Sequence, residues 1–334
     1  MSRPVIAATL IVRNEERCLA RCLASVAPHV DRIVVLDTGS TDATPRIAEQ
    51  AGAELHHLAW PNDFAAARNH LLDLADADWA LMLDADETLV AGGEAIRDWC
   101  AAPPRLGRIA IRSSFDQPGG GTATDTSWVT RLLPRDVRYT GRVHEQPLSD
   151  LPRERTAIAC DHDGYRDVRL GEKSARNRPL LLLDLADRPG DPYIRYQLGR
   201  DAEVAGDHAD AADWYERAAT GTRAGDSWRH DLTVRRLHTL GQAGRAIEAM
   251  ELAEAQMPDW DDSPDFFFAV GNLALDLAIT EPASALGQWL PLATAAWERC
   301  LAIGDRPDLD GSVAGRGSFL ARQNLDAIRS QLAG

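Results

Sequence analysis

Apolar and polar positions alternate in blocks along the first part of the chain. Residues 5–12 and 32–37 are apolar runs of strand length, and each gives way to polar residues. Between these runs, Leu19, Cys22 and Leu23 recur at the spacing of one helix face. Strands that alternate with helices over short connections favour a parallel sheet with right-handed crossovers. The pattern therefore predicts an α/β fold.

The same alternation continues for two more units. A turn-rich segment leads into a predicted helix over residues 43–51, and a strand is predicted near residues 54–58. A helix over residues 63–74 follows, and residues 79–83 form a fourth strand. All four strands run in one direction in this arrangement, so their carboxyl ends meet at one edge of the sheet.

The fourth strand runs directly into three acidic side chains, Asp84, Asp86 and Glu87. Carboxylates this close together repel each other and raise each other's pKa, and a divalent cation would remove that conflict. Asp84 and Asp86 are spaced so that both can reach one ion. The alternative for an Asp-x-Asp pair is an acidic turn that only caps a following helix.

Polar side chains also end two other predicted strands. Asn14 and Glu15 follow the first strand, and Asp37 ends the second. In open α/β sheets ligands bind at the carboxyl ends of the strands, so these groups should converge with Asp84 and Asp86. This convergence favours a ligand site over a helix cap.

Four segments of the chain resemble a known family. They are residues 10–16 (LIVRNEE), 34–42 (VVLDTGSTD), 63–69 (DFAAARN) and 83–87 (LDADE). Their order and spacing resemble the family 2 glycosyltransferases, which have a GT-A fold with a Rossmann-like, mostly parallel sheet. The resemblance is to the bacterial branch in which tetratricopeptide-like (TPR-like) helices follow the catalytic domain.

The resemblance implies a site for a nucleotide-diphosphate sugar. Asp37 would accept a hydrogen bond from the base, usually uracil, while Asn14 and Glu15 would line the nucleoside pocket. Arg68 would brace the pyrophosphate or hold the Asp-x-Asp loop, and the alternative for it is simple neutralisation of the acidic cluster. A UDP-linked glucose or N-acetylglucosamine is the favoured donor, with GDP-mannose second.

The resemblance also implies a metal site. Asp86 would ligate the ion directly, and Asp84 would bind the ribose or reach the metal through water. His162 would complete the metal shell, and a purely structural histidine is the alternative. Carboxylate ligands beside phosphates favour Mn²⁺ or Mg²⁺. The ion would bridge the phosphates and stabilise charge on the departing nucleoside diphosphate.

A Gly-x-x-His-Glu segment ends at Glu145, and related sequences carry a similar segment where other family members place a catalytic acid. Glu145 is our first choice for the base that takes the acceptor proton in an inverting transfer, and His144 is the second. The alternative is that both only stabilise a loop. The family's usual Glu-Asp base motif and the Gln-x-x-Arg-Trp signature of processive synthases are missing, which favours transfer of a single sugar.

Two further strands are predicted before this segment, over residues 108–115 and 127–133. The glycine-rich residues 118–122 between them predict an irregular loop. This loop is either a plain hairpin connection or a lid near the acceptor.

The character of the chain changes near residue 175, where strand-like runs give way to Ala, Leu, Asp and Arg at helical spacing. We predict a catalytic domain over residues 1–165, a linker over 166–176 and a helical, TPR-like domain over 177–334. The boundary follows from the change of period and from the charged residues that separate the two parts.

A weak repeat supports the helical domain. Gly206 and Ala211 occupy positions that a tetratricopeptide unit needs for close packing of two helices, and Gly244 and Ala249 repeat them. Stacked helix pairs share a core and leave a concave face. We expect that face to buttress the catalytic domain, to form a homodimer or to capture a protein acceptor.

Composition limits the partners. A net charge of −15 over 334 residues and a pI near 5.0 argue against nucleic-acid binding. Five cysteines without a disulfide pattern favour a reducing cytoplasm, and Cys18 and Cys22 are interpreted as core residues. The N-terminus lacks a signal pattern and no run has the length of a membrane span, although contact with a membrane-bound lipid acceptor stays compatible.

Two other classes of protein compete with this interpretation. The main alternative is a non-catalytic, TPR-type interaction protein with a relic nucleotide-sugar domain; a relic should have lost at least one residue of the site. A Rossmann dehydrogenase is excluded because no Gly-x-Gly-x-x-Gly follows the first strand. The acceptor, whether peptide, lipid or saccharide, is not specified by residues 100–165.

Overall fold

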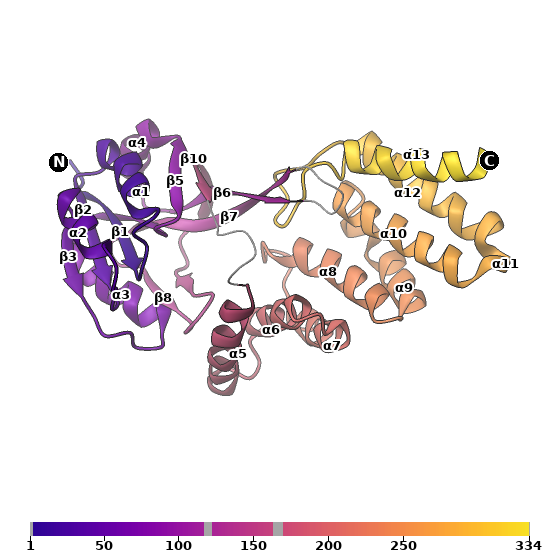
Figure 1. The fold of residues 1–334 in the computed structure, drawn as a ribbon, viewed down its shortest axis with the longest axis horizontal. Coiled ribbons are helices and arrows are strands. Elements are labelled where there is room, and N and C mark those ends of the chain that lie inside the picture. The colour runs from indigo at the N-terminus through magenta and orange to yellow at the C-terminus, as the bar shows by residue number, and fades with distance from the viewer. Residues whose placement is uncertain (1–2, 117–121, 163–169, 334) are drawn as a thin grey trace. The chain divides into compact units, whose positions relative to one another are not determined.

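A computed structural model describes residues 3–116, 122–162 and 170–333 of the chain (Figure 1). The glycine-rich loop predicted at 118–122 lies outside the described residues except for Thr122, which begins a strand. The first part of the predicted linker, up to residue 169, also lies outside them.

The polypeptide forms two compact units. The sheet unit comprises Met1–Ser114 and Ser127–Arg166, and the helical unit comprises Phe115–Thr126 and Asp167–Gly334. Each unit has hydrophobic core clusters of its own. The predicted domain limits stay a prediction, because compactness alone does not define a domain.

The strands belong to the first half of the chain. They are β1 (Ile6–Val12), β2 (Arg32–Asp37), β3 (Glu54–His57), β4 (Trp79–Leu83), β5 (Glu87–Ala91), β6 (Leu106–Asp116), β7 (Thr122–Pro134), β8 (Arg138–Thr140), β9 (Gln146–Leu148) and β10 (Arg153–His162).

The helices fall into two groups. Those between the strands are α1 (Leu19–Val26), η1 (Ala27–His29), α2 (Thr44–Gln50), α3 (Phe64–Ala75), η2 (Gly93–Ala95) and α4 (Ile96–Ala101). Those after the strands are α5 (Leu170–Asp187), α6 (Pro192–Val204), α7 (His208–Ala219), α8 (Arg229–Gln242), α9 (Ala246–Gln256), η3 (Met257–Asp259), α10 (Pro264–Thr280), α11 (Pro282–Ser284), η4 (Ala285–Trp289), α12 (Leu290–Ile303) and α13 (Phe319–Ala333).

The main sheet has eight strands in the order β3-β2-β1-β4-β7-β6-β10-β5. Strands β3, β2, β1 and β4 are parallel to one another, as the sequence pattern predicts. β7 runs antiparallel to β4, while β10 is parallel to β6 and antiparallel to β5. β8 and β9 form a separate two-stranded sheet. This mostly parallel sheet, followed by helices alone, confirms the predicted fold class.

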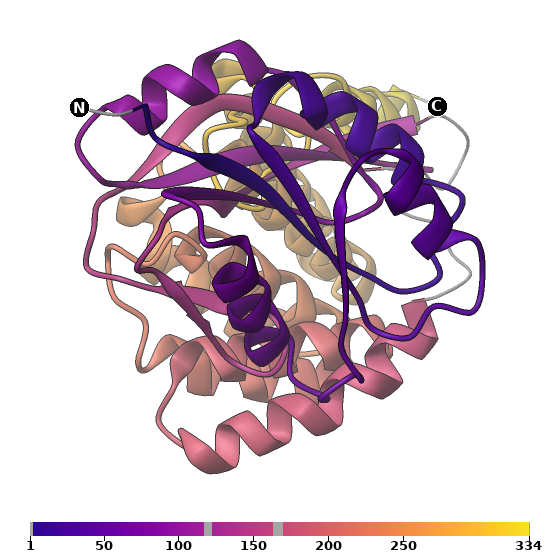
Figure 2. The ribbon, with the colours of Figure 1, turned by 90° about the vertical axis from the view of Figure 1, so that its left-hand side faces the viewer.

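Helices cover both faces of the parallel part of the sheet (Figure 2). Ile6, Ala8 and Leu10 of β1 pack in one core cluster with α1, α2 and α4, while Ala7 packs in another with Leu71 of α3. Successive side chains of a strand point to opposite faces. Burial on both faces explains why these strands are continuous apolar runs rather than alternating ones.

Two elements differ from the sequence prediction. The acidic turn after β4 leads into strand β5 and not into a helix, so helix capping does not explain its carboxylates. Residues 170–176, predicted as linker, belong to helix α5. The charged composition of that stretch is as compatible with a solvated helix as with a connection.

The predicted repeat corresponds to two helix pairs of the helical unit. Gly206 ends the first helix of the pair α6–α7, and Gly244 does the same for α8–α9, with φ of 78° and 76°. Such left-handed conformations favour glycine. Gly199 of α6 lies against Tyr215 of α7, because a Cβ at Gly199 would be only 2.4 Å from the Tyr215 ring.

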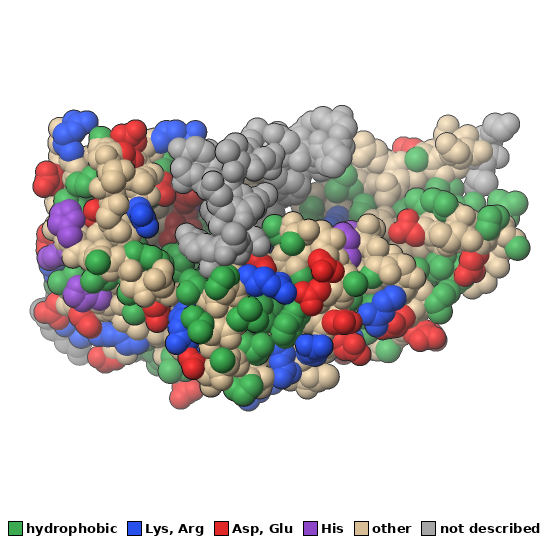
Figure 3. Space-filling view, turned by 60° about the horizontal axis from the view of Figure 1, so that its bottom comes forward, with side chains coloured by type: hydrophobic (Ala, Val, Ile, Leu, Met, Phe, Trp, Pro, Cys, Tyr) green, Lys and Arg blue, Asp and Glu red, His purple; other side chains and the backbone are tan. Residues whose placement is uncertain are grey.

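Side chains of both charges are intermixed on the face of the molecule drawn in Figure 3. In the helical unit, Arg245 makes exposed ion pairs with Asp213 and Glu248. Exposed pairs of this kind contribute little to stability. They neutralise part of the acidic excess of the chain locally.

Two compositional expectations can be compared with the structure. All five cysteines are free and buried, and Cys18 and Cys22 belong to the sheet core as predicted. Among the described residues, no single helix has the length and hydropathy of a membrane span. The segments Pro264–Thr280 and Pro282–Ile303 pass that test only as a pair, and the pair is bent by 115°.

Candidate active site

The turn between β4 and β5 carries the acidic residues that follow the fourth strand. Glu87 N donates to Asp84 O at 3.0 Å, and Asp84 N donates to the Glu87 carboxylate at 2.9 Å. These two bonds close the turn over Ala85 and Asp86. Asp86 therefore lies at the tip of the turn, at the carboxyl end of β4, with its side chain 22% exposed.

Two arginines from other elements neutralise this turn. Arg68 of α3 donates through Nη2 to Asp84 Oδ1 at 3.0 Å, and Arg131 of β7 donates to Asp84 Oδ2 at 2.5 Å. Arg131 Nη2 also lies 3.5 Å from Glu87 Oε1. Arg68 donates through Nε to Glu145 Oε1. One connected ion cluster thus joins the acidic turn to the segment that carries the predicted base.

The electrostatics of this cluster push its two neighbouring acids in opposite directions. Burial opposes ionisation of Asp84, but Arg131 and Arg68 outweigh it and hold the pKa of Asp84 well below its usual range. Burial raises the pKa of Glu87 to about 7 against the pull of Arg131, and the charge on Asp84 adds to the rise. Asp84 is therefore ionised at neutral pH, while Glu87 keeps a proton in part.

Asp86 meets His162 beside the turn. His162 Nε2 lies 3.2 Å from Asp86 Oδ2, although the two residues are 76 positions apart in the chain. Strand pairing brings them together, because His162 of β10 lies opposite Glu87 of β5 and Ser113 of β6. The structure thus places together two residues that the resemblance assigns to one metal.

The chemistry of this pair fits a divalent cation. A carboxylate oxygen and an imidazole nitrogen suit Mn²⁺, and Ser113 Oγ lies 3.1 Å from the far ring nitrogen of His162, where ligating histidines usually have an outer partner. Within the described ranges, no group of three His, Cys, Asp or Glu side chains could enclose an ion. Substrate phosphates and water would supply the other ligands, as they commonly do for Mg²⁺.

Helix α3 also holds the segment that carries Glu145. Asn69 accepts from Tyr139 N at 2.7 Å and donates to Tyr139 O at 3.0 Å, which fixes β8 to α3. The Glu145 side chain is 11% exposed, and Arg68 occupies its Oε1. Its Oε2 accepts no hydrogen bond from any residue that the structure describes. Glu145 is therefore oriented through its Oε1.

The two candidate bases have different surroundings. Glu145 lies in the ion cluster, whereas its neighbour His144 is exposed. His144 also has a φ of 51°, a left-handed conformation that is uncommon for residues other than glycine. Non-glycine residues in this region cost free energy and gather at functional sites, so His144 stays the second candidate.

Asp37 lies at the carboxyl end of β2, where it pairs in register with Val12 of β1. Its carboxylate is buried, accepts hydrogen bonds from Ser40 N at 3.2 Å and from the Ser40 hydroxyl, and has His57 Nδ1 3.3 Å away. His57 ends β3, so three adjacent parallel strands contribute to this corner. Sequence reasoning assigned Asp37 but missed Ser40 and His57 as its partners.

Asn14 and Glu15 build the loops around Asp37. Asn14 has a φ of 56°, and its Oδ1 accepts from Thr41 N at 2.8 Å. Glu15 N donates to Thr44 Oγ1 at 2.7 Å. These bonds tie the loop after β1 to the loop after β2. The structure thus gives both residues a role in shaping the corner, and their predicted contact with a nucleoside stays a prediction.

Arg131 is the main site residue that sequence reasoning missed. The predicted strand over 127–133 contains it, and a single cation next to Leu132 and Leu133 in such a strand is a signal for a buried ion pair. The structure confirms that signal, because Arg131 is 9% exposed and contacts both Asp84 and Glu87.

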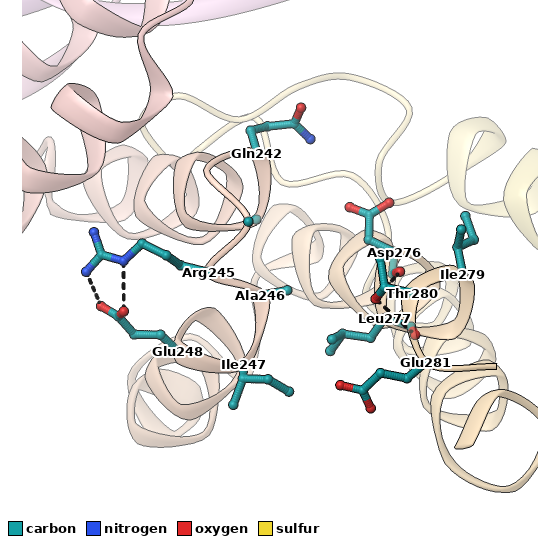
Figure 4. A pocket seen from close by; sticks show the side chains of 12 residues that line it. Gln242, Arg245, Ala246, Ile247, Glu248, Asp276, Leu277, Ile279, Thr280 and Glu281 are labelled. Atoms are coloured by element: carbon teal, nitrogen blue, oxygen red, sulfur yellow. Dashed lines mark hydrogen bonds and ion pairs between the residues drawn. The ribbon is translucent and has the colours of Figure 1, made fainter. Parts of the chain in front are cut away.

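A separate hollow of about 560 Å³ lies in the helical unit, between α8, α9 and α10 (Figure 4). The ion pair of Arg245 and Glu248, 2.6 Å apart, lines one side, and Asp276 and Ile279 of α10 line the other, with Glu281 just after that helix. These side chains provide a mixed polar and apolar surface.

Comparison with known proteins agrees with the motifs of the sheet unit. Residues 9–91 match the family model described as glycosyl transferase family 2. A TPR repeat-containing protein of Synechococcus elongatus is 33% identical over 301 residues, which are 85% of this chain and 69% of that relative. The prophage-derived glycosyltransferase SunS of Bacillus subtilis is 27% identical over 237 residues, which are 68% of this chain and 56% of that relative.

Among solved structures, the chain matches glucosyl-3-phosphoglycerate synthase from Mycobacterium tuberculosis in complex with Mn²⁺, UDP-glucose and phosphoglyceric acid. The match has 23% identity and a TM-score of 0.28, and it covers 32% of this chain and 44% of that one. The family model and the Synechococcus relative together show that the chain belongs to the family 2 glycosyltransferases. It falls in the bacterial branch with TPR-like helices after the catalytic domain. The resemblance seen in the sequence is confirmed.

Proposed function

We propose that this glycosyltransferase moves one sugar, with inversion, from a nucleoside-diphosphate sugar to a peptide, lipid or saccharide acceptor. A UDP-sugar is the favoured donor, and Mn²⁺ or Mg²⁺ is the proposed cofactor. The observation that carries this proposal is that Arg68 makes ion pairs with both Asp84 and Glu145. One guanidinium joins the acidic turn expected to bind the donor to the group expected to take the acceptor proton.

On the donor side, Asp37 would accept from the nucleobase, and Asp86 with His162 would hold the cation. A divalent cation at that pair would neutralise the phosphates and stabilise charge on the leaving nucleoside diphosphate. Asp84 already makes ion pairs with Arg68 and Arg131, so we assign it to the support of the turn and to the ribose.

On the acceptor side, Glu145 would act as the general base. The acceptor oxygen attacks the anomeric carbon, the bond from that carbon to the phosphate oxygen breaks, and the acceptor proton passes to Glu145 Oε2. Arg68 keeps Oε1 occupied and so presents Oε2. His144 is the second candidate for this step.

The test is calorimetric titration of UDP and of GDP into the protein, each with Mn²⁺ and with a chelator. We expect binding of UDP that is at least tenfold tighter with Mn²⁺, and Asp86→Ala should remove this difference because it deletes the carboxylate ligand. Asp161→Ala is the matched control, because Asp161 is exposed and adjoins His162 in β10. Folding of every variant is checked by circular dichroism.

Failure of both nucleotides to bind folded protein would contradict the proposal and favour the alternative, a TPR-type interaction protein with a relic sheet unit. The hollow between α8, α9 and α10 is the observation that favours that alternative. A cytoplasmic location, a homodimer through the helical unit and contact with a membrane-bound acceptor stay predictions.

A further inference from the structure

Arg131 contacts both ends of the acidic turn. β7 runs antiparallel to β4 with Leu132 opposite Leu81, so Arg131 lies beside the point where β4 enters the turn. Its Nη2 reaches Asp84 Oδ2 at 2.5 Å and Glu87 Oε1 at 3.5 Å. Asp84 and Glu87 are the first and last residues of the turn, and they are already joined by one backbone hydrogen bond and by one from Asp84 N to the Glu87 carboxylate.

Stability alone is a poor explanation for this arginine. Arg131 is 9% exposed, and its Nε is buried without a hydrogen-bond partner among the described residues. A buried donor left unpaired destabilises the folded protein. A buried ion pair is in general no more stabilising than an apolar side chain of the same volume. The position of Arg131 is therefore better explained by the geometry that it imposes on the turn than by stability.

That geometry acts on Asp86. With Asp84 and Glu87 both held by one guanidinium, the tip of the turn between them has little freedom, and Asp86 is presented to His162 at 3.2 Å. Asp84 has one oxygen on Arg131 and the other on Arg68, which leaves Asp86 as the carboxylate free to take a cation.

We propose that Arg131 is a positioning residue for the cation: it clamps Asp84 and Glu87 so that Asp86 faces His162, and it withdraws Asp84 from direct coordination. This inference rests on the proposed function, since it concerns the same Asp86–His162 pair. The ion pairs of Arg131 are with Asp84 and Glu87, so its effect on the cation passes through the turn.

The test compares UDP affinity with Mn²⁺ and with chelator in Arg131→Met and Arg131→Lys. The dissociation constant with chelator, divided by the one with Mn²⁺, gives a ratio that measures the contribution of the metal. We expect Arg131→Lys to keep the fold and the affinity measured with chelator, because it keeps the charge. The ratio should fall at least tenfold, because a lysine ammonium cannot span both carboxylates in the fork geometry of arginine.

Arg135→Met is the matched control, because Arg135 lies just after β7 and its side chain is 46% exposed. A folded Arg131→Lys protein with the wild-type ratio would overturn the inference, and so would an equal loss in Arg135→Met. If Arg131→Met fails to fold, Arg131→Lys alone decides. If the wild-type protein shows no effect of Mn²⁺, the proposed metal site fails first, and the inference falls with it.

Discussion

Arg68 shows how one side chain can serve two groups with different tasks. Its Nη2 holds Asp84 and its Nε holds Glu145, and the side chain is 7% exposed. Burial would by itself lower the pKa of Arg68, but Glu145 and Asp84 more than offset that effect and the pKa rises. The charge is therefore fixed at any pH of interest. The sequence left two roles open for Arg68: to brace the pyrophosphate or hold the Asp-x-Asp loop, or to neutralise the acidic cluster. Its ion pair with Asp84 is compatible with both, so the role stays a prediction.

Asp231 plays a comparable part in the helical unit. Tyr196 donates to its carboxylate through the hydroxyl, and Arg235 donates through Nε at 2.7 Å. Burial opposes ionisation, but Arg235 and Arg200 outweigh it, so the pKa of Asp231 lies below its usual 3.8. A depressed pKa in the folded protein contributes stability above pH 3.8, and the contribution is lost as the pH falls through the folded pKa.

Asp231→Asn should lower the free energy of unfolding by about 3 kcal/mol at neutral pH, because it removes one partner of a buried ion pair. The difference from wild type should shrink below pH 3.8, where the unfolded wild-type chain takes up the proton. Urea unfolding at the two pH values measures it. Asp213→Asn, at an exposed pair with Arg245, should cost under about 1 kcal/mol. A difference independent of pH would contradict this account of Asp231.

At the scale of elements, the pair α6–α7 depends on a close approach at Gly199. A Cβ there would lie 2.4 Å from Cε1 of Tyr215, a side chain with no exposed surface and a hydroxyl bonded to Glu203 at 2.7 Å. The ring cannot move aside without breaking that bond or opening the core. This contact explains why a glycine stands at position 199.

Gly199→Ala should therefore destabilise the protein by about 2 kcal/mol through overpacking. Gly190→Ala is the control, because a Cβ at Gly190 meets nothing within 4 Å, and it should change stability by less than about 0.5 kcal/mol. Thermal unfolding measures both variants. Equal midpoints for the two would show that the α6–α7 contact is looser than this structure has it.

The elements also show where prediction from sequence succeeds. β1, β2 and β4 are predicted because each contains a continuous apolar run, and the site follows from the rule that parallel strands present their carboxyl ends at one edge. β5 is missed because an acidic turn, Asp84 to Asp86, directly precedes it and the strand itself begins with Glu87. Arg131 is missed as a site residue because it reaches Asp84 across an antiparallel pairing, and a one-residue change of register would turn it to the other face.

At the scale of the whole molecule, the chain consists of two units with separate cores, and the site described above lies entirely in the sheet unit. The matching Synechococcus protein is similar over 85% of this chain, so the likeness includes helices as well as the sheet. Family membership therefore applies to the combination of both units, while donor, acceptor and metal belong to the proposal for the sheet unit.

The most direct measurement of the central claim is release of UDP from UDP-glucose and UDP-N-acetylglucosamine, with water as the slow acceptor. We expect release that requires Mn²⁺. Its rate should fall at least about hundredfold in Glu145→Gln, because the general base is lost. His144→Gln should keep most of the rate, and all three proteins should bind UDP alike. Release that is independent of metal, or a Glu145→Gln protein with the wild-type rate, would contradict it.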